Sequence, residues 1–175
     1  DPFERERGGI AAPLVVTDSI TIYDIAEKAA KLFSVAKMPT EAAWTQTFAA
    51  EMRAAIRKHL VDDTLLVFGD CQTCQAIALG TGIFDPEETE AARRHLVRII
   101  HRDGDINACG VLGNRYLFHV LAEAGEIDLA YKIITGTGRT CYGYWVIRGF
   151  TTLCESFLDV DGPGLDSRNH HFFGD

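Results

Sequence analysis

Apolar residues recur at helical spacing along most of the chain, and this periodicity favours a helical fold. Apolar residues at positions i, i+3, i+4 and i+7 line one face of an α-helix. The first such stripe consists of Ile22, Ile25, Ala26, Ala29 and Phe33. The second follows Met38-Pro39 and consists of Trp44, Phe48, Met52, Ala55, Ile56 and Leu60. The pattern predicts two long helices, with Thr40 as the cap of the second.

Start and stop signals divide the rest of the chain into further helices. The segment 85–88 (Asp-Pro-Glu-Glu) combines a capping residue, a proline at the first helical position and a glutamate at the third. Asn114 is the expected cap of a helix that Gly125 closes, and Gly136 ends the next. A last helix is expected to start near Thr151.

These signals predict an all-α fold of about seven helices. Only 14–16 and 65–67 resemble strands, and both are short. Consecutive helices joined by short connections pack antiparallel. In a chain of 175 residues that is 47% hydrophobic, the helices can bury a sizeable core. The whole chain is therefore expected to form part of one domain.

Charge and composition exclude several classes of partner. The net charge of −8 argues against a surface for nucleic acid, and the basic run 93–95 (Arg-Arg-His) is expected to be a solvated helix face. No apolar run reaches the length of a membrane span. No signal peptide is visible, and the first residue is Asp1 rather than Met, so we expect a processed or excised piece. The sequence does not distinguish a cytoplasmic from a periplasmic or secreted protein.

Five cysteines are scattered along the chain: Cys71, Cys74, Cys109, Cys141 and Cys154. An odd, scattered set is not typical of a disulfide framework. Cys71 and Cys74 have the Cys-x-x-Cys spacing, but a zinc site would need a second ligand pair at similar spacing. A thioredoxin-like redox site would need a βαβ context, whereas the surroundings are helical. Structural thiols are the favoured interpretation, and no metal is expected.

Residues that suit carbohydrate chemistry gather near the C-terminus. The segment 143–157 (Gly-Tyr-Trp-Val-Ile-Arg-Gly-Phe-Thr-Thr-Leu-Cys-Glu-Ser-Phe) places Glu155 among aromatic residues. Asn169, His170 and His171 follow about a dozen residues later. Aromatic rings stack on the C–H faces of sugars, amides and imidazoles bind hydroxyl groups, and a carboxylate can take the proton of a water. Taken alone, Glu155 could equally be an ordinary exposed or helix-capping glutamate.

Three segments carry a resemblance to a known family: 143–145 (Gly-Tyr-Trp), 149–155 (Gly-Phe-Thr-Thr-Leu-Cys-Glu) and 169–174 (Asn-His-His-Phe-Phe-Gly). They resemble the C-terminal part of the catalytic domain of bacterial α-L-rhamnosidases, glycoside hydrolase family 78. Weaker matches at 69–73, 109–117 and 125–131 extend the resemblance over roughly 65–175. The family has an (α/α)6 barrel and inverts the anomeric configuration. Seven helices would make only part of such a barrel.

The resemblance implies roles for individual residues. Glu155 matches the general base, and His170 matches a histidine that binds rhamnose hydroxyls. Asn169, Tyr144 and Trp145 are the other candidate sugar contacts, although the ring of Trp145 could equally belong to the core. The chemistry requires no cofactor.

Other polar residues have simpler interpretations. His171 is expected to be structural, because alternate residues of an extended segment face opposite sides. A metal role for the His170-His171 pair is less favoured, since no further ligand is evident nearby. Asp70 and Arg148 could each bind a sugar hydroxyl, but ion pairs are the favoured explanation for both. Asp103 and Asp105 could form a carboxylate dyad, but turn chemistry explains them as well.

The chain departs from the family pattern in three places. Cys154 stands where an aromatic residue often precedes the base, and 140–142 (Thr-Cys-Tyr) replaces a Pro-Ser-Trp-like turn. The general acid of the family lies in an acidic, Asp- and Arg-containing motif further toward the N-terminus, which the cluster 1–7 does not match. We therefore expect residues 1–175 to be the C-terminal portion of a longer catalytic domain that lacks the N-terminal helices of the barrel.

The leading hypothesis is a bacterial glycosidase that releases terminal rhamnose from plant polysaccharides or glycosides. Another (α/α)6 glycosidase, such as an unsaturated uronyl hydrolase, is one alternative. A non-catalytic helical carbohydrate-binding or scaffold module is a second. A partial barrel would also leave an apolar flank exposed, through which the chain could dimerise.

Overall fold

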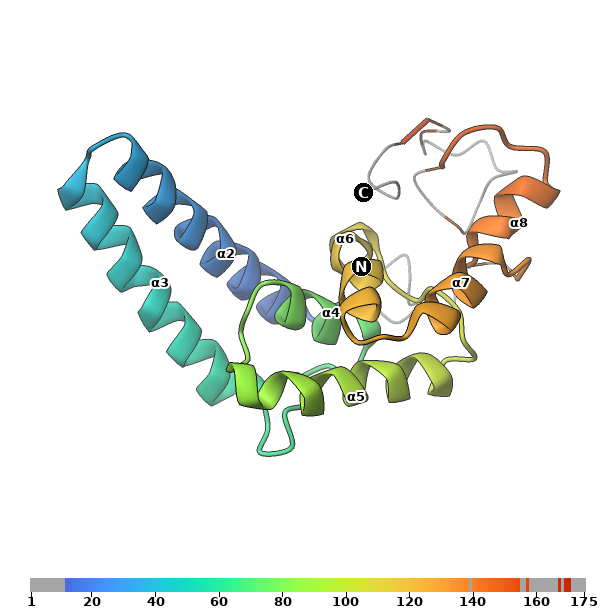
Figure 1. Cartoon of the computed structure of the whole chain (residues 1–175), viewed down its shortest axis with the longest axis horizontal. Helices are drawn as coiled ribbons and strands as arrows, with labels where there is room; N and C mark the ends of the chain where they lie inside the picture. Colours follow the sequence, from blue (N-terminus) through green and yellow to red (C-terminus); the bar gives the residue numbers. More distant parts are fainter. Residues whose placement is uncertain (1–11, 139, 155–156, 158–166, 168, 171–175) are drawn as a thin grey trace.

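The computed structural model describes residues 12–138, 140–154, 157, 167, 169 and 170. Within these ranges every regular element is a helix, which confirms the predicted fold class. One isolated antiparallel bridge joins Val61 and Val67. None of the described helices is long and apolar enough to cross a membrane. The helices are α2 (Leu14–Val35), α3 (Pro39–Leu60), α4 (Gln72–Gly80), α5 (Pro86–Arg102), α6 (Val111–Glu123), α7 (Ile127–Thr135) and α8 (Tyr142–Ile147) (Figure 1).

Helices α2 and α3 form a long antiparallel hairpin that extends away from the other helices (Figure 1). α2 ends at Val35 and α3 begins at Pro39, so the predicted break is confirmed. Met38 occupies the cap position, and Thr40, the predicted cap, lies inside the helix instead. Proline takes the first helical position because its missing N–H would have no partner there.

The packed face of α2 differs in part from the predicted one. Val16, Ile20 and Tyr23 are buried, whereas Ile22 and Ile25 are 45% and 59% exposed. Ala26 of the predicted stripe is buried as well, and Ala29 and Phe33 are half-buried. The prediction is therefore wrong at Ile22 and Ile25, because α2 carries apolar residues on both sides. The segment 14–16, which resembled a strand, is the first turn of this helix.

The stripe predicted for α3 is correct toward its C-terminal end and wrong at Trp44 and Ala55. Ile56 is buried, and the residues that pack against the same core are Phe48, Met52 and Leu60. Trp44 is 66% exposed and stacks on Phe48, with 5.7 Å between ring centroids. Ala55 is also exposed. Aromatic stacking along the helix surface thus replaces burial at the end of the hairpin.

A capping box at the start of α5 also joins this helix to α3. The backbone N–H of Asp85 donates to Glu88 Oε2 at 2.8 Å, which confirms the predicted helix start. Arg57 of α3 donates two hydrogen bonds of 2.7 Å to the Glu88 carboxylate, and Arg53 donates one of 2.7 Å to Asp85. Because charge-assisted bidentate bonds are strong, they hold the two helices together. The hydrogen bonds from Arg57 lower the pKa of Glu88 to about 2.

Helix α4 lies at the centre and packs against α6, α5 and α2. Its residues 72–78 are all buried. A Cβ atom at Gly113 of α6 would come within 2.7 Å of Thr73 Cα, so only glycine permits this close approach. Gln75 is fully buried; its amide oxygen accepts from Val67 N–H at 3.0 Å and its amide nitrogen donates to the Ala92 carbonyl at 3.1 Å.

The start of α6 and the position of the last helix differ from the predictions. α6 begins at Val111 with Gly110 as its cap residue, so Asn114 lies inside the helix and is buried. The last described helix is α8, whereas Thr151 lies in a bend and starts no helix among the described residues. Gly149, with φ 79°, turns the chain between the two. Its left-handed conformation explains why the glycine-rich segment does not continue as a helix.

Candidate active site

A cluster of aromatic rings joins α6, α8 and the segment after α8, and we call Phe118, Tyr142, Trp145 and Phe157 the aromatic cluster. Trp145 stacks on Phe157, with 4.3 Å between centroids and 5° between planes. Tyr142 meets Phe118, Trp145 and Phe157 edge to face at 5.4–5.7 Å. Trp145 and Phe157 are 2% and 5% exposed. The cluster therefore forms a small core of its own, in geometries that aromatic pairs prefer.

A chain of buried amides anchors Tyr142. Asn107 donates to Asn114 Oδ1 at 2.6 Å, and Asn114 donates to the Tyr142 hydroxyl at 2.8 Å. Asn107 Oδ1 accepts from the backbone N–H of Cys109 at 2.9 Å. Both asparagines are 1% exposed, so each of these bonds replaces a bond to water. Burial raises the pKa of Tyr142 to about 12, and its hydroxyl stays protonated at neutral pH.

The structure brings several of the predicted sugar contacts close to the aromatic cluster. Tyr144 is half-buried and packs against it, together with Leu153. The backbone N–H of His170 donates to the Leu153 carbonyl at 2.8 Å, and its side chain is half-buried. Asn169 is exposed, and its backbone N–H donates to Ser167 Oγ at 3.2 Å. Segments that the sequence separates by more than a dozen residues thus lie side by side.

The predicted base, Glu155, and the predicted structural histidine, His171, lie outside the described residues. Cys154 and Phe157, the described residues nearest to Glu155 in sequence on either side, are both buried in the core around Trp145. Trp145 itself is buried with one face against Phe157, as expected of a core residue.

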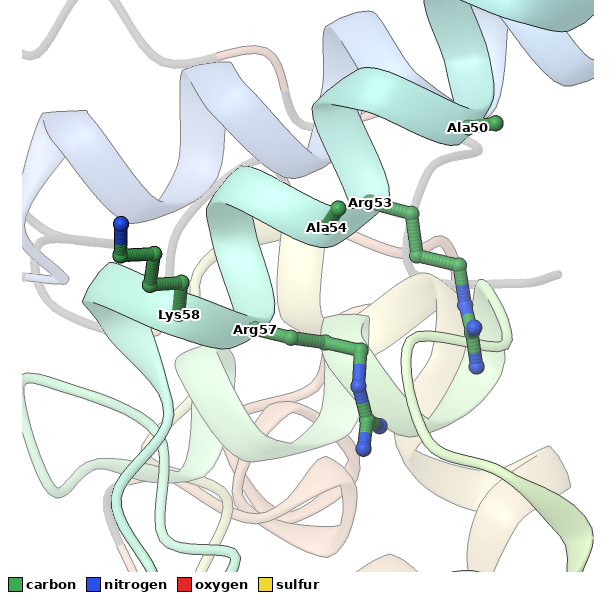
Figure 2. A pocket seen from close by; sticks show the side chains of 5 residues that line it. All are labelled: Ala50, Arg53, Ala54, Arg57 and Lys58. Atoms are coloured by element: carbon green, nitrogen blue, oxygen red, sulfur yellow. The ribbon is translucent and has the colours of Figure 1, made fainter.

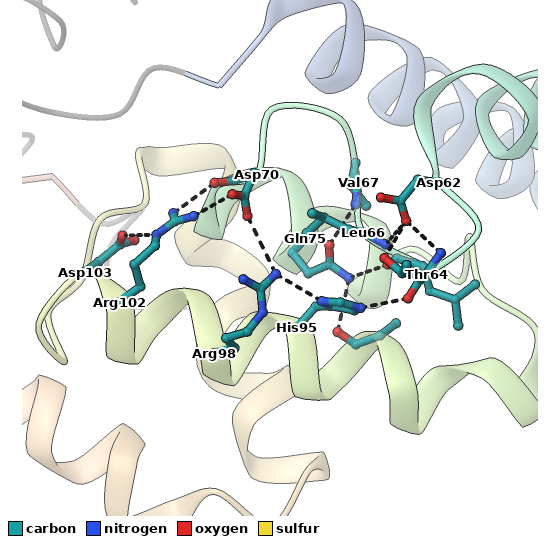
Figure 3. Close-up of polar contacts among 12 residues, drawn as sticks. Asp62, Thr64, Leu66, Val67, Asp70, Gln75, His95, Arg98, Arg102 and Asp103 are labelled. Atoms are coloured by element: carbon teal, nitrogen blue, oxygen red, sulfur yellow. Dashed lines mark hydrogen bonds and ion pairs between the residues drawn. The ribbon is translucent and has the colours of Figure 1, made fainter.

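Asp70 and Asp103 take part in a chain of polar contacts along α5 (Figure 3). Arg102 donates to Asp70 Oδ2 at 2.7 Å and to Asp103 Oδ1 at 3.1 Å. Asp103 also accepts from Gln72 Nε2 at 2.9 Å, which links α5 to the start of α4. The ion-pair interpretation of Asp70 agrees with these contacts.

Asp105 is held in the same way after the end of α5. It pairs with Lys132 at 2.5 Å and with His101 at 2.6 Å, and the hydrogen bond from Lys132 is the main reason that its pKa is lowered. Its φ of 58° places it in a tight turn. Turn chemistry, rather than a carboxylate dyad, therefore explains both Asp103 and Asp105.

A shallow groove on α3 is lined by Ala50, Arg53, Ala54, Arg57 and Lys58 (Figure 2). The two guanidinium groups extend from the same face of the helix (Figure 2). Both guanidinium groups form ion pairs with the carboxylates at the start of α5, so the contact between α3 and α5 accounts for the groove. Among the described residues, no group of three or more His, Cys, Asp or Glu side chains could hold a metal ion.

The sequence predicts neither the buried hydrogen bonds of Asn114 nor the stacking of Phe157 on Trp145. Asn114 was interpreted as a helix cap, although it lies three and seven positions before Leu117 and Leu121, both fully buried. A polar residue on the apolar face of a helix needs a buried partner, and that signal was present in the sequence. Nothing in the local pattern indicated that Phe157 stacks on Trp145, because the contact depends on the path of the chain after α8.

Solved structures of other proteins share this fold. The structure of *Streptomyces avermitilis* alpha-L-rhamnosidase complexed with L-rhamnose matches 94% of this chain with a TM-score of 0.86 at 24% identity, and the chain covers 16% of it. The native enzyme from *Aspergillus terreus* matches 85% with a TM-score of 0.77 at 24% identity, and the chain covers 18% of it. The chain is thus part of a six-hairpin, (α/α)6-type glycosidase fold, as predicted.

The family follows from the sequence itself. Residues 7–175 match the model of the bacterial alpha-L-rhamnosidase six-hairpin glycosidase domain, and the chain belongs to this family. An alpha-L-rhamnosidase of *Streptomyces avermitilis* is 29% identical over 150 residues, which is 79% of this chain and 14% of that protein. One from *Formosa agariphila* is 32% identical over 145 residues, or 77% and 15%. The chain therefore spans about one seventh of the length of these relatives.

Proposed function

We propose that residues 1–175 are the C-terminal portion of the catalytic domain of an inverting α-L-rhamnosidase. The family match over 7–175 is the observation that carries this proposal. The substrate would be a terminal α-L-rhamnose on a plant polysaccharide or glycoside. The named relatives are all alpha-L-rhamnosidases, which favours this function over a uronyl hydrolase.

In the proposed mechanism Glu155 is the general base. An inverting glycosidase uses one carboxylic acid to protonate the leaving oxygen and one carboxylate to activate a water on the opposite face of the sugar. Glu155 would remove the proton of that water as it attacks the anomeric carbon. The transition state has oxocarbenium-ion character, so groups that bind the ring in its flattened form lower the barrier.

The sugar contacts in this proposal come from two segments that lie together. His170 would bind rhamnose hydroxyls, and its backbone bond to Leu153 supports this role because Leu153 precedes Glu155 by two residues. Tyr144 and Asn169 keep accessible surface and would add polar contacts. The buried, stacked ring of Trp145 favours a role in shaping the pocket from within the core.

The general acid is proposed to come from a segment of the catalytic domain outside these residues. The chain should then have no glycosidase activity alone, because protonation of the leaving group would be missing. The test compares the 175-residue chain with the longer protein on an aryl α-L-rhamnoside. Turnover by the chain alone near the rate of the longer protein would contradict the proposal.

The stereochemistry of the product tests the reaction class. With the longer protein and an aryl α-L-rhamnoside, ¹H NMR during the first minutes should show β-L-rhamnose before mutarotation. An unsaturated uronide should not be cleaved. Release of α-L-rhamnose as the first product, or faster cleavage of the uronide, would contradict an inverting rhamnosidase.

A further inference from the structure

Two thiols at the start of α4 lie in contact. Cys71 is the cap residue that precedes α4, and Cys74 lies in its first turn. Their Sγ atoms are 3.2 Å apart, which is within hydrogen-bond distance for sulfur. The side chains are 1% and 0% exposed. The two cysteines of the Cys-x-x-Cys motif are therefore in direct contact in the folded chain.

The start of the helix makes the two sulfurs chemically different. The hydrogen bond between the two sulfurs stabilises the Cys71 thiolate and lowers the pKa of Cys71, and the backbone N–H groups of Cys74 and Thr73 act in the same direction. The same hydrogen bond, together with burial, raises the pKa of Cys74. Thiolates are favoured at helix N-termini and in Cys-x-x-Cys motifs, and the thiolate is the form that reacts with oxidants. Cys71 thus has the character of an attacking thiol and Cys74 that of a resolving thiol.

We propose that Cys71 and Cys74 form a redox-modification site that hydrogen peroxide closes to an intramolecular disulfide. The Cys71 thiolate attacks one peroxide oxygen, the O–O bond breaks, and a sulfenic acid forms as hydroxide leaves. The Cys74 sulfur then attacks the Cys71 sulfur, so that the S–S bond forms and the S–O bond breaks. The hydroxide that leaves takes up the thiol proton as water. Overall, two thiols lose two electrons and two protons, and one peroxide is reduced to two waters.

Burial and fold restrict how this site can act. Hydrogen peroxide is a small oxidant, so it can reach a buried thiol pair more easily than a bulky disulfide oxidant can. The surroundings are helical rather than βαβ, which does not suit a thioredoxin-like electron carrier. The disulfide would instead modify the chain itself. It would fix the first turn of α4, where Thr73 lies against Gly113 of α6.

Cys109 is the competing partner, since it is the other thiol whose charge affects Cys74. Trypsin distinguishes the two outcomes, because the sequence places no Lys or Arg between His59 and Arg93. The tryptic peptide 59–93 contains only Cys71 and Cys74, and peptide 103–115 contains only Cys109. Peptide 140–148 contains Cys141, whose thiol pKa is raised by burial, and serves as an internal control.

The experiment treats the folded, fully reduced protein with hydrogen peroxide, then alkylates the remaining thiols in denaturant and maps the tryptic peptides by mass. Peptide 59–93 should lose both alkylation sites and become lighter by two hydrogens, while peptide 140–148 stays fully alkylated. Dithiothreitol should restore both sites. A cross-link between peptides 59–93 and 103–115, irreversible oxygen addition at Cys71, or unchanged peptide 59–93 would overturn the proposal.

Two variants separate the roles of the sulfurs. Cys74→Ser should let Cys71 stop at the sulfenic acid, which dimedone traps as a covalent adduct. Cys71→Ser should leave Cys74 alkylatable after the same exposure. Dimedone labelling of Cys74 in place of Cys71 would overturn the assignment. The peptide map of the unaltered protein tests the disulfide even if a variant does not fold.

Discussion

At the scale of single residues, the hydrogen bond between Asn114 and Tyr142 ties the aromatic cluster to a buried amide of α6. Tyr142→Phe keeps the ring but leaves the buried Asn114 amide without its acceptor. An unsatisfied buried group costs about 1–3 kcal/mol, and we expect a loss of stability in that range. Urea unfolding monitored by circular dichroism measures it.

The matched control for this variant is Tyr131→Phe, which removes the hydroxyl of a tyrosine that is 67% exposed. Its free energy of unfolding should change by less than about 0.5 kcal/mol. Equal effects of the two substitutions would show that the buried amide chain does not support the cluster.

The sequence offers candidate site residues only where chemistry and motif coincide. Glu155 and His170 are candidates because their segments match a family pattern, and the structure adds that the backbones of Leu153 and His170 are hydrogen-bonded. The amide chain through Asn107 and Asn114 was not foreseen. It joins residues on separate segments, and local periodicity contains no information about such contacts.

At the scale of secondary-structure elements, the ion pair between Arg57 of α3 and Glu88 of α5 makes the stability of the fold depend on pH. The folded-state pKa of Glu88 is about 2, below its ordinary value of 4.5, because Arg57 donates to its carboxylate. A lowered pKa stabilises the fold above the ordinary value, and this contribution is lost as the pH falls from about 4.5 to about 2.

Glu88→Gln should therefore lower stability at neutral pH by about 1 kcal/mol, since the pair is partly solvent-exposed, and should have a smaller effect at pH 2. Thermal unfolding between pH 2 and 7 measures the difference. Glu90→Gln is the control, because Glu90 makes only an exposed pair with Arg94. An effect of Glu88→Gln that is constant over this range would contradict the assigned pKa.

The existence of the long helices was predictable, but the choice of their packed face was not. Leu14, Ile25 and Leu32 are all exposed, and their spacings of 11 and 7 residues return to the same side of α2. Val16 and Ile20, on the other side, are buried. A helix that is apolar on two sides is typical of the interior of a larger protein. For such a helix, periodicity alone cannot tell which side contacts which neighbour.

At the scale of the whole molecule, the second apolar side of α2 predicts that the 175-residue chain self-associates when produced alone. Ile25→Glu and Leu32→Glu should reduce its weight-average mass in solution, because they place charges within the exposed apolar stripe. Light scattering over a range of concentrations measures the mass. A chain that stays monomeric at all concentrations would contradict the prediction.

The kcat of Glu155→Gln in the longer protein tests the proposed role of Glu155 as the base of an α-L-rhamnosidase. Loss of a general base costs about 10²–10⁴-fold, so kcat should fall in that range with KM changed only modestly. His170→Ala should instead raise KM with a smaller effect on kcat. A Glu155→Gln enzyme that retains more than about a tenth of the original kcat would contradict the assignment.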